Sequence, residues 1–171
     1  MKGAIFDLDG TLIDSMGVWD KIDDALLRSY GKEPDHAYRE AITRLSFWEG
    51  AAYIIERYHL SKTPEQILAQ IDAMAWEEYR YHIRLKPGVL AYLHYLSRRK
   101  VKLAVGTSCT EKLCHAVLES NQVADMFHQF IFANQVPNGK RSPVFFQTCA
   151  QKMGLQCREC TVFEDSVFAY L

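Results

Sequence analysis

The sequence predicts an α/β fold in which a parallel sheet is flanked by helices and an all-helical segment is inserted after the first strand. From Lys86 onward, short apolar runs alternate with longer segments of helical periodicity, which is the pattern of β-α units. Residues 15–85 show helical patterns only. We therefore assign residues 1–14 and 86–171 to a core domain and residues 15–85 to a helical domain.

The first element is a short buried strand over residues 3–8, because this run is apolar except for one acid. A helix follows, with Asp14 or Ser15 as the expected N-cap and Gly31 as its stop. Its apolar residues recur three and four positions apart, at Trp19, Ile22, Leu26 and Tyr30. Another helix begins at Thr63-Pro64, where Thr63 and a Gln three residues later form a capping pattern.

The second half of the chain predicts the remaining strands and their helices. The expected elements are a helix over 89–96, a strand over 101–105, a helix around 113–117, a strand over 130–132, a helix over 142–153 and a strand over 160–163. Strands and helices that alternate in this way form a parallel sheet with helices on its faces.

Composition excludes several classes of protein. Hydrophobic residues make up 49% and charged residues 24%, which excludes a disordered chain. The net charge of -1 argues against nucleic-acid binding by bulk charge. The sequence has no apolar run of membrane-spanning length and no secretory signal, and its five cysteines suit free thiols. We expect a cytoplasmic protein, a monomer or weak homodimer, without nucleic-acid or membrane partners.

Polar residues follow the predicted strands at their carboxyl ends, where open parallel sheets bind ligands. They are Asp7, Asp9 and Gly10 after the first strand, Thr107 and Ser108 after the second, Lys140 before the third core helix, and Glu164 and Asp165 after the last strand. The sequence therefore predicts that two pairs of acids, a hydroxyl and an ammonium group converge on one rim of the sheet.

This combination suits a phosphate ester held with a divalent cation. Four neighbouring carboxylates repel one another unless a positive charge lies among them, and Mg²⁺ prefers oxygen ligands shared with phosphate. Lys140, the Thr107 hydroxyl and the amides around Ser108 can bind phosphate oxygens. If Asp7 faces the phosphorus it can attack, while Asp9 protonates the leaving oxygen. The residues alone do not say which aspartate attacks; Gly10 permits a sharp turn beside the phosphate.

These residues resemble the motifs of the haloacid dehalogenase superfamily, in its phosphatase and beta-phosphoglucomutase-like branch. The run Phe-Asp-Leu-Asp-Gly-Thr-Leu-Ile-Asp-Ser over residues 6–15 is similar to the first motif. Thr107, Lys140 and the segment over residues 162–166 resemble the second, third and fourth motifs, in the family's order. The resemblance implies a Rossmann-like core with a helical cap inserted after the first motif.

The resemblance also implies roles for the individual residues. Asp7 would be the nucleophile and Asp9 the acid/base, with Thr107 and Lys140 on the phosphate. Magnesium would be held by Asp7, the Asp9 backbone carbonyl and Asp165, and by Glu164 directly or through water. We accordingly expect a Mg²⁺-dependent phosphatase that hydrolyses a small phosphorylated metabolite through an aspartyl-phosphate.

The chain departs from the family pattern in several places. Arg141 and Val144 stand where relatives usually carry Pro and an acid, and Ala169 stands where they carry Gly. The sequence stops at Leu171, where the family core usually continues with a helix and a strand. We expect the C-terminal core strand to be missing, one sheet edge to be bare, and stability and activity to be reduced.

Two alternatives stay open. The first is a phosphomutase of the same branch; residues 18–21 lack the histidine that phosphoglucomutases commonly place there, which favours a phosphatase. The second is a truncated relic that binds without turnover, against which the presence of all four motifs argues. A dehalogenase is disfavoured because Asp9, Gly10 and Thr11 favour phosphate chemistry.

Overall fold

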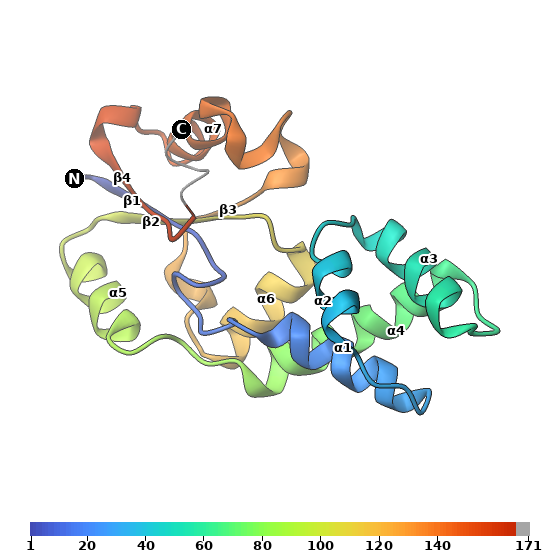
Figure 1. The fold of residues 1–171 in the computed structure, drawn as a ribbon. Coiled ribbons are helices and arrows are strands. Elements are labelled where there is room, and N and C mark those ends of the chain that lie inside the picture. The colour runs from blue at the N-terminus through green and yellow to red at the C-terminus, as the bar shows by residue number, and fades with distance from the viewer. Residues whose placement is uncertain (167–171) are drawn as a thin grey trace. The chain divides into compact units, whose positions relative to one another are not determined.

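Four parallel strands form the sheet of the protein, shown in Figure 1 as a computed structural model in which residues 1–166 are described. The chain divides into two compact units: a core unit of Met1–Met16 with Tyr79–Leu171, and a helical unit of Gly17–Glu78. Whether these units correspond to the domains assigned from the sequence, with boundaries at 14/15 and 85/86, stays a prediction.

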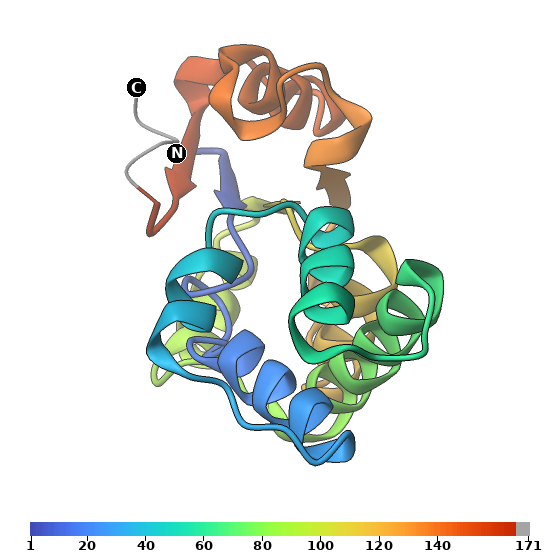
Figure 2. The same cartoon turned by 45° about the vertical axis from the view of Figure 1, so that its right-hand side comes forward.

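The core unit contains all four strands. They are β1 (Gly3–Phe6), β2 (Lys102–Thr107), β3 (Gln129–Phe132) and β4 (Cys160–Phe163), in the order β3-β2-β1-β4. Its helices are α5 (Val89–Arg98), α6 (Glu111–Ser120) and α7 (Pro143–Lys152). Figure 1 shows α7 on one face of the sheet and α5 and α6 on the other, and Figure 2 shows the same layers after rotation. The predicted α/β fold is therefore confirmed.

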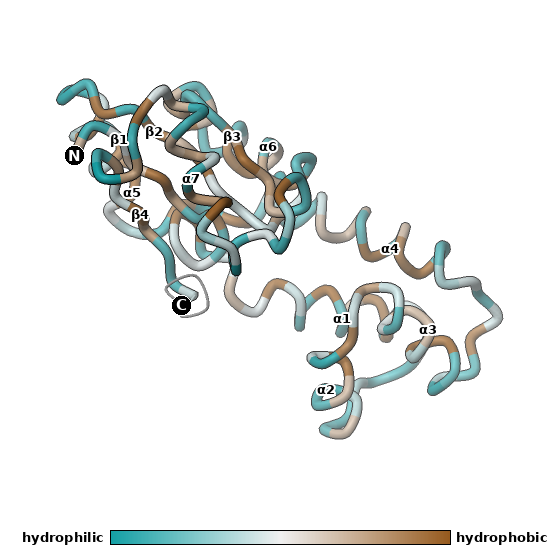
Figure 3. The backbone as a smooth tube through the Cα atoms, turned by 90° about the horizontal axis from the view of Figure 1, so that it is seen from above, coloured by the Kyte–Doolittle hydropathy of each residue, from teal (hydrophilic) through white to brown (hydrophobic). Residues whose placement is uncertain are grey.

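The two central strands, β1 and β2, are buried because they consist mostly of small and apolar residues. All four residues of β1 are buried, as are the last five of β2. Beneath α7, a cluster of apolar side chains joins helix and sheet: Ile5, Ala104, Ile131, Val136, Phe145, Cys149 and Met153. Figure 3 shows the hydrophobic stretch of β3 that contributes to this cluster. On the other face, Phe6 packs its ring edge-on against Tyr92 of α5.

The helical unit contains α1 (Val18–Ser29), α2 (His36–Ile42), α3 (Phe47–Tyr58) and α4 (Pro64–Glu77). Two of these helices begin with reciprocal capping boxes, Ser46 with Glu49 at α3 and Thr63 with Gln66 at α4. The predicted start of α4 is thereby confirmed.

The predicted N-cap of α1 is wrong. Neither Asp14 nor Ser15 caps this helix; its N-cap is Gly17, in the left-handed conformation at φ 78° and without a side-chain cap bond. The reason is that the backbone of Asp14 is already engaged, since its N–H donates to the Arg84 carbonyl at 3.0 Å. The chain leaves this pairing before it can turn into a helix.

Within residues 1–166, the helices are all too short or too polar to cross a bilayer. The predicted departure at Ala169 lies outside the described residues. In the described part of the chain, β4 is an edge strand of the sheet.

Candidate active site

The end of β1 lies where the order of the sheet reverses. Chain order runs from β1 to β2 and β3 on one side, and then returns to β4 on the other side of β1. In open α/β sheets, the crevice at such a reversal is where ligands bind. Asp7 is the first residue after β1, and its backbone N–H donates to the Phe163 carbonyl of β4 at 2.9 Å. The first predicted site residue therefore stands at the centre of the rim.

Glu164 and Asp165 lie beside Asp7 because β1 and β4 run in parallel register. Phe6 pairs with Phe163, so the residues that follow the two strands leave the sheet together. One carboxylate oxygen each from Asp7, Glu164 and Asp165 lie within 4.8 Å of one another. The structure thus brings together three acids that are far apart in the sequence.

Gly10 makes room for this group of acids. Its φ of 82° lies in the left-handed region that glycine adopts without strain. A Cβ built at this position would overlap Asp165 Oδ2. The Gly10 carbonyl accepts a hydrogen bond from Lys86 Nζ at 2.6 Å, which fixes the turn from the other side. Any larger residue at position 10 would displace Asp165.

Lys140 supplies the positive charge of the rim. It lies in a short 3₁₀ turn, Gly139–Arg141, and its Nζ contacts Asp7 Oδ1 and lies 2.8 Å from Glu164 Oε2. All three side chains are largely shielded from water, with exposed fractions of 13% for Lys140, 7% for Asp7 and 2% for Glu164. Because Lys140 balances only one of three carboxylates, the cluster carries excess negative charge if all three are ionised.

The environment of Asp7 differs from that of a surface carboxylate. Burial raises the pKa of Asp7 from 3.8 to about 6, because the charged form loses its hydration. The Lys140 ammonium opposes this rise in pKa, and the Glu164 charge adds to it. A positive charge placed among these acids would stabilise the ionised form of Asp7.

The two residues after β2 lie differently. Ser108 is exposed and lines the cavity at the rim. Thr107 is 1% exposed and is not among the residues that line this cavity. Its Oγ1 accepts a hydrogen bond from the Cys109 N–H at 2.9 Å, while its own proton stays available for donation. The N-cap of α6 is Thr110, so Thr107 does not cap that helix.

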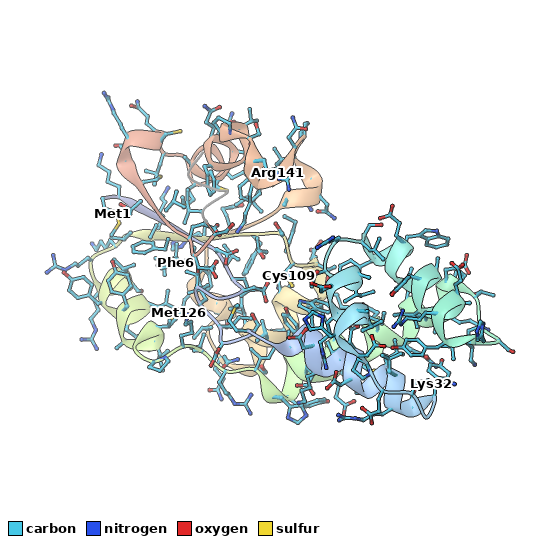
Figure 4. All side chains as sticks on the ribbon, viewed as in Figure 1. Met1, Phe6, Lys32, Cys109, Met126 and Arg141 are labelled. Atoms are coloured by element: carbon cyan, nitrogen blue, oxygen red, sulfur yellow. The ribbon has the colours of Figure 1, made fainter. Side chains whose placement is uncertain are left out.

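A cavity of about 590 Å³ opens over the rim. It is lined by Asp7, Asp9, Ser108, Ala133, Asn138, Gly139, Lys140, Arg141, Glu164, Asp165 and Ser166. Figure 4 labels Arg141 and also Cys109, which belong to the connections that follow β3 and β2. Six of the eight predicted site residues therefore share one cavity, and Gly10 and Thr107 lie behind its wall.

Several residues at the site were not assigned a role from the sequence. Asn138 and Ser166 line the cavity, and their signal was their position beside Lys140 and Asp165. The Tyr79 hydroxyl donates a hydrogen bond to Asp9 Oδ1 at 2.6 Å, and Lys86 Nζ donates one to the Gly10 carbonyl. For Tyr79 the sequence carried no signal, because the residue lies 70 positions from its partner.

The residues of the rim fit a hard divalent cation. Three carboxylates provide oxygen donors close together, with no sulfur or imidazole among the residues that line the cavity. Mg²⁺ prefers such donors and retains several waters, for which an open cavity leaves room. The excess of negative charge at the rim favours the same ion.

Comparison with known proteins adds to this geometry. A family model described as haloacid dehalogenase-like hydrolase matches residues 4–170. The chain is 29% identical over 166 residues to fructose-1-phosphate phosphatase YqaB of Escherichia coli (strain K12), covering 97% of this chain and 87% of that protein. It is 24% identical to a phosphorylated carbohydrates phosphatase of Thermotoga maritima, covering 97% and 77%.

Solved structures show the same fold. The crystal structure of a candidate beta-phosphoglucomutase from Thermotoga maritima superposes with a TM-score of 0.87 at 24% identity, covering 97% of this chain and 77% of that chain.

Proposed function

The chain belongs to the haloacid dehalogenase-like hydrolase family, and we propose that it is a magnesium-dependent phosphatase that releases phosphate from a small phosphorylated metabolite. The observation that carries this proposal is the meeting of Asp7, Glu164, Asp165 and Lys140 at one cavity at the centre of the sheet. Relatives named as phosphatases of fructose 1-phosphate and of phosphorylated carbohydrates support a sugar phosphate as the substrate class.

Asp7 acts as the nucleophile. Its carboxylate oxygen attacks phosphorus, a bond forms between that oxygen and phosphorus, and the bond from phosphorus to the ester oxygen breaks. Asp9, two residues further along the same turn and lining the same cavity, gives its proton to the leaving oxygen. The products of this step are the free alcohol and an aspartyl-phosphate on Asp7.

Water completes the cycle. Asp9, now a carboxylate, takes a proton from a water molecule whose oxygen attacks phosphorus. The bond between phosphorus and the Asp7 oxygen breaks, inorganic phosphate leaves, and both aspartates regain their starting states. The same carboxyl therefore serves as acid in the first step and as base in the second.

Asp7 and Asp165, with Glu164 and the Asp9 backbone carbonyl, would hold the magnesium ion. When bound, this ion supplies positive charge that stabilises the transferring phosphoryl group. Lys140 contributes a second positive charge from a fixed position, since two carboxylates orient its ammonium group. Ser108, which lines the cavity just after β2, would donate to a phosphate oxygen. We propose that the buried Thr107 hydroxyl, whose proton is not used by its bond to Cys109, donates toward the same group.

A phosphate-release screen tests the proposal. Purified protein is offered sugar, nucleotide and small organic phosphates, each with Mg²⁺ and with excess chelator. We expect release from one or more sugar phosphates, with turnover abolished by the chelator and restored by added Mg²⁺. Absence of release from every ester in the presence of Mg²⁺ would refute the proposal.

The same screen separates the two alternatives. Conversion of glucose 1-phosphate to glucose 6-phosphate without release of phosphate would replace the phosphatase with a phosphomutase, as the likeness to a candidate beta-phosphoglucomutase allows. A folded protein that binds Mg²⁺ and turns over no ester would instead be the non-catalytic relic.

A further inference from the structure

Tyr79 is buried beneath the rim and is bonded to the proposed acid/base residue. It lies in a π-helical turn, Glu78–His82, and its side chain is 1% exposed. Its hydroxyl donates to Asp9 Oδ1 at 2.6 Å. Turns of this kind occur within α-helices and are frequent at functional sites.

The Tyr79 hydroxyl has a second polar neighbour. The Cys109 thiol lies in hydrogen-bonding range of the same oxygen. A phenol has one proton to donate, and here that proton goes to Asp9, so the thiol is the donor to the Tyr79 oxygen. Burial raises the pKa of both Tyr79 and Cys109 above their usual values, which keeps both groups protonated as donors. Asp9 Oδ1 therefore accepts a hydrogen bond from a buried phenol that stays protonated.

Asp9 lines the cavity, whereas Tyr79 does not. The hydrogen bond from Tyr79 thus holds one carboxyl oxygen from behind the cavity wall and leaves the other oxygen for the reacting groups. The backbone of the same turn is fixed independently, because Leu12 N–H bonds the Leu8 carbonyl at 2.9 Å and Gly10 N–H bonds the Ile13 carbonyl at 3.1 Å. What the backbone leaves undetermined is the rotation of the Asp9 side chain.

We propose that Tyr79 is a positioning residue that fixes the Asp9 carboxyl by one oxygen, so that the other oxygen delivers the proton to the leaving group. This inference rests on the proposed phosphatase function. No covalent change occurs at Tyr79, which keeps its proton throughout. Loss of its hydroxyl should therefore slow the proton transfers that need an aligned Asp9, the first of which is protonation of the leaving group.

Tyr79→Phe tests this role because it removes the hydroxyl alone. The readout is kcat/KM for two substrates, an alkyl or sugar phosphate and para-nitrophenyl phosphate. The value of kcat/KM covers the reaction up to departure of the leaving group, and nitrophenolate departs without needing a proton. We expect a loss of about 30-fold for the alkyl ester and no more than about 3-fold for the aryl ester. Equal losses for both esters, or no loss, would overturn the proposal.

Tyr38→Phe is the matched control. Tyr38 is equally buried, at 0% exposed, but it belongs to the helical unit and has no contact with Asp9 among the described residues. We expect Tyr38→Phe to leave both kcat/KM values within about 2-fold of wild type. A loss in this variant that matches Tyr79→Phe would mean that the effect reports general destabilisation.

A double variant tests the same point without depending on absolute rates. Once Asp9→Asn has removed the acid, Tyr79→Phe should lower kcat/KM for the alkyl ester by less than about 2-fold further. A further loss as large as in the Asp9 wild-type background would place Tyr79 in another role.

A structural readout separates this inference from the proposed function. In a crystal structure of Tyr79→Phe we expect the Asp9 side chain to occupy more than one rotamer, whereas the parent occupies one. If the parent hydrolyses no ester, the proposed function fails, and the rotamers still decide whether Tyr79 positions Asp9. A single unchanged Asp9 rotamer in Tyr79→Phe would refute the positioning role.

Discussion

Two regions of the molecule contain an aspartate whose pKa burial raises to about 6: Asp7 in the core unit and Asp23 in the helical unit. The neighbours of Asp23 are local, since the acids that add to its rise in pKa are Asp20 and Asp24 on the same helix. Arg39, on the next helix, lies 2.7 Å from Asp24. Asp7 instead meets Lys140 and Glu164, both more than 130 positions away in the sequence.

The comparison shows that a raised pKa does not by itself identify a catalytic group. Helix packing can shield a carboxylate from water as effectively as an active site does. What distinguishes the rim is that loops from separate parts of the chain bring three acids and Lys140 to one open cavity. Beside it, Gly10 leaves the space that Asp165 occupies. Matched substitutions in the two regions test this distinction.

The first prediction replaces each aspartate in turn. Asp7→Asn should lower kcat for phosphate release by at least about 1000-fold, because the amide oxygen is a poor nucleophile. Asp23→Asn should leave kcat within about 2-fold of wild type, because Asp23 only packs within the helical unit. The measurement is the rate of phosphate release by each variant. A similar loss of kcat in both would contradict the proposal that only Asp7 is catalytic.

The second prediction concerns the cation of each region. Lys140→Met should lower kcat/KM by about 100-fold or more, because it removes a charge aimed at the phosphoryl group and the ammonium that contacts Asp7 and Glu164. Arg39→Met removes the cation beside Asp24 and should change kcat/KM by less than about 2-fold. Steady-state rates measure both; an active Lys140→Met would contradict the proposed role of the rim.

The third prediction uses two glycines with similar backbones. Gly10→Ala forces a Cβ onto Asp165 Oδ2, whereas Gly88, at φ 85°, has nothing within 4 Å of its Cβ position. Both substitutions should cost about 1 kcal/mol of stability, because alanine disfavours a positive φ. Only Gly10→Ala should also weaken Mg²⁺ binding, by about 10-fold, as titration calorimetry would show. Equal Mg²⁺ affinity in the two variants would contradict the crowding of Asp165.

The fourth prediction concerns stability and pH in the helical unit. Below about pH 4, Asp23 is protonated in both folded and unfolded states; above about pH 6, it is charged in both, and the folded state bears the cost of burial. The contribution of Asp23 to stability therefore falls as pH rises from about 4 to about 6. Asp23→Asn should raise the free energy of unfolding by about 1 kcal/mol near pH 8, after solvent screening is allowed for, and by little near pH 4. Denaturant melts at both pH values measure this difference, and a larger gain at the lower pH would contradict it.

Much of the fold and part of the site followed from the sequence. The strands were readable because compact apolar runs alternate with helices, and the family and fold class are confirmed by the match over residues 4–170. A parallel sheet brings strand ends to one edge, which is why Asp7, Glu164 and Asp165 could be placed together. The roles assigned to these residues stay predictions.

The other features of the fold and the site depend on contacts between residues that are distant in the sequence, which local sequence patterns do not predict. The sequence did not indicate that Thr107 is buried or that its Oγ1 accepts a hydrogen bond from the backbone of its own loop, and its role on the phosphate stays a prediction. Asp14 and Ser15 are residue types that favour the N-cap position. The Asp14 N–H instead donates to the Arg84 carbonyl, and the N-cap of α1 is Gly17. Tyr79, which looks like an ordinary core residue in the sequence, lies in a π-helical turn and donates a hydrogen bond to Asp9, a contact between residues 70 positions apart.

Chemical trapping of the aspartyl-phosphate shows whether Asp7 is the nucleophile of the rim. The protein is quenched during turnover with substrate and Mg²⁺, and borohydride then reduces any acyl phosphate to the alcohol. We expect mass spectrometry to find homoserine at position 7 only when both substrate and Mg²⁺ are present. With para-nitrophenyl phosphate, whose leaving group needs no proton, we expect more homoserine in Asp9→Asn, because this variant slows hydrolysis of the intermediate more than its formation. Reduction at a different acid, or steady phosphate release without modification of Asp7 in either protein, would contradict the account.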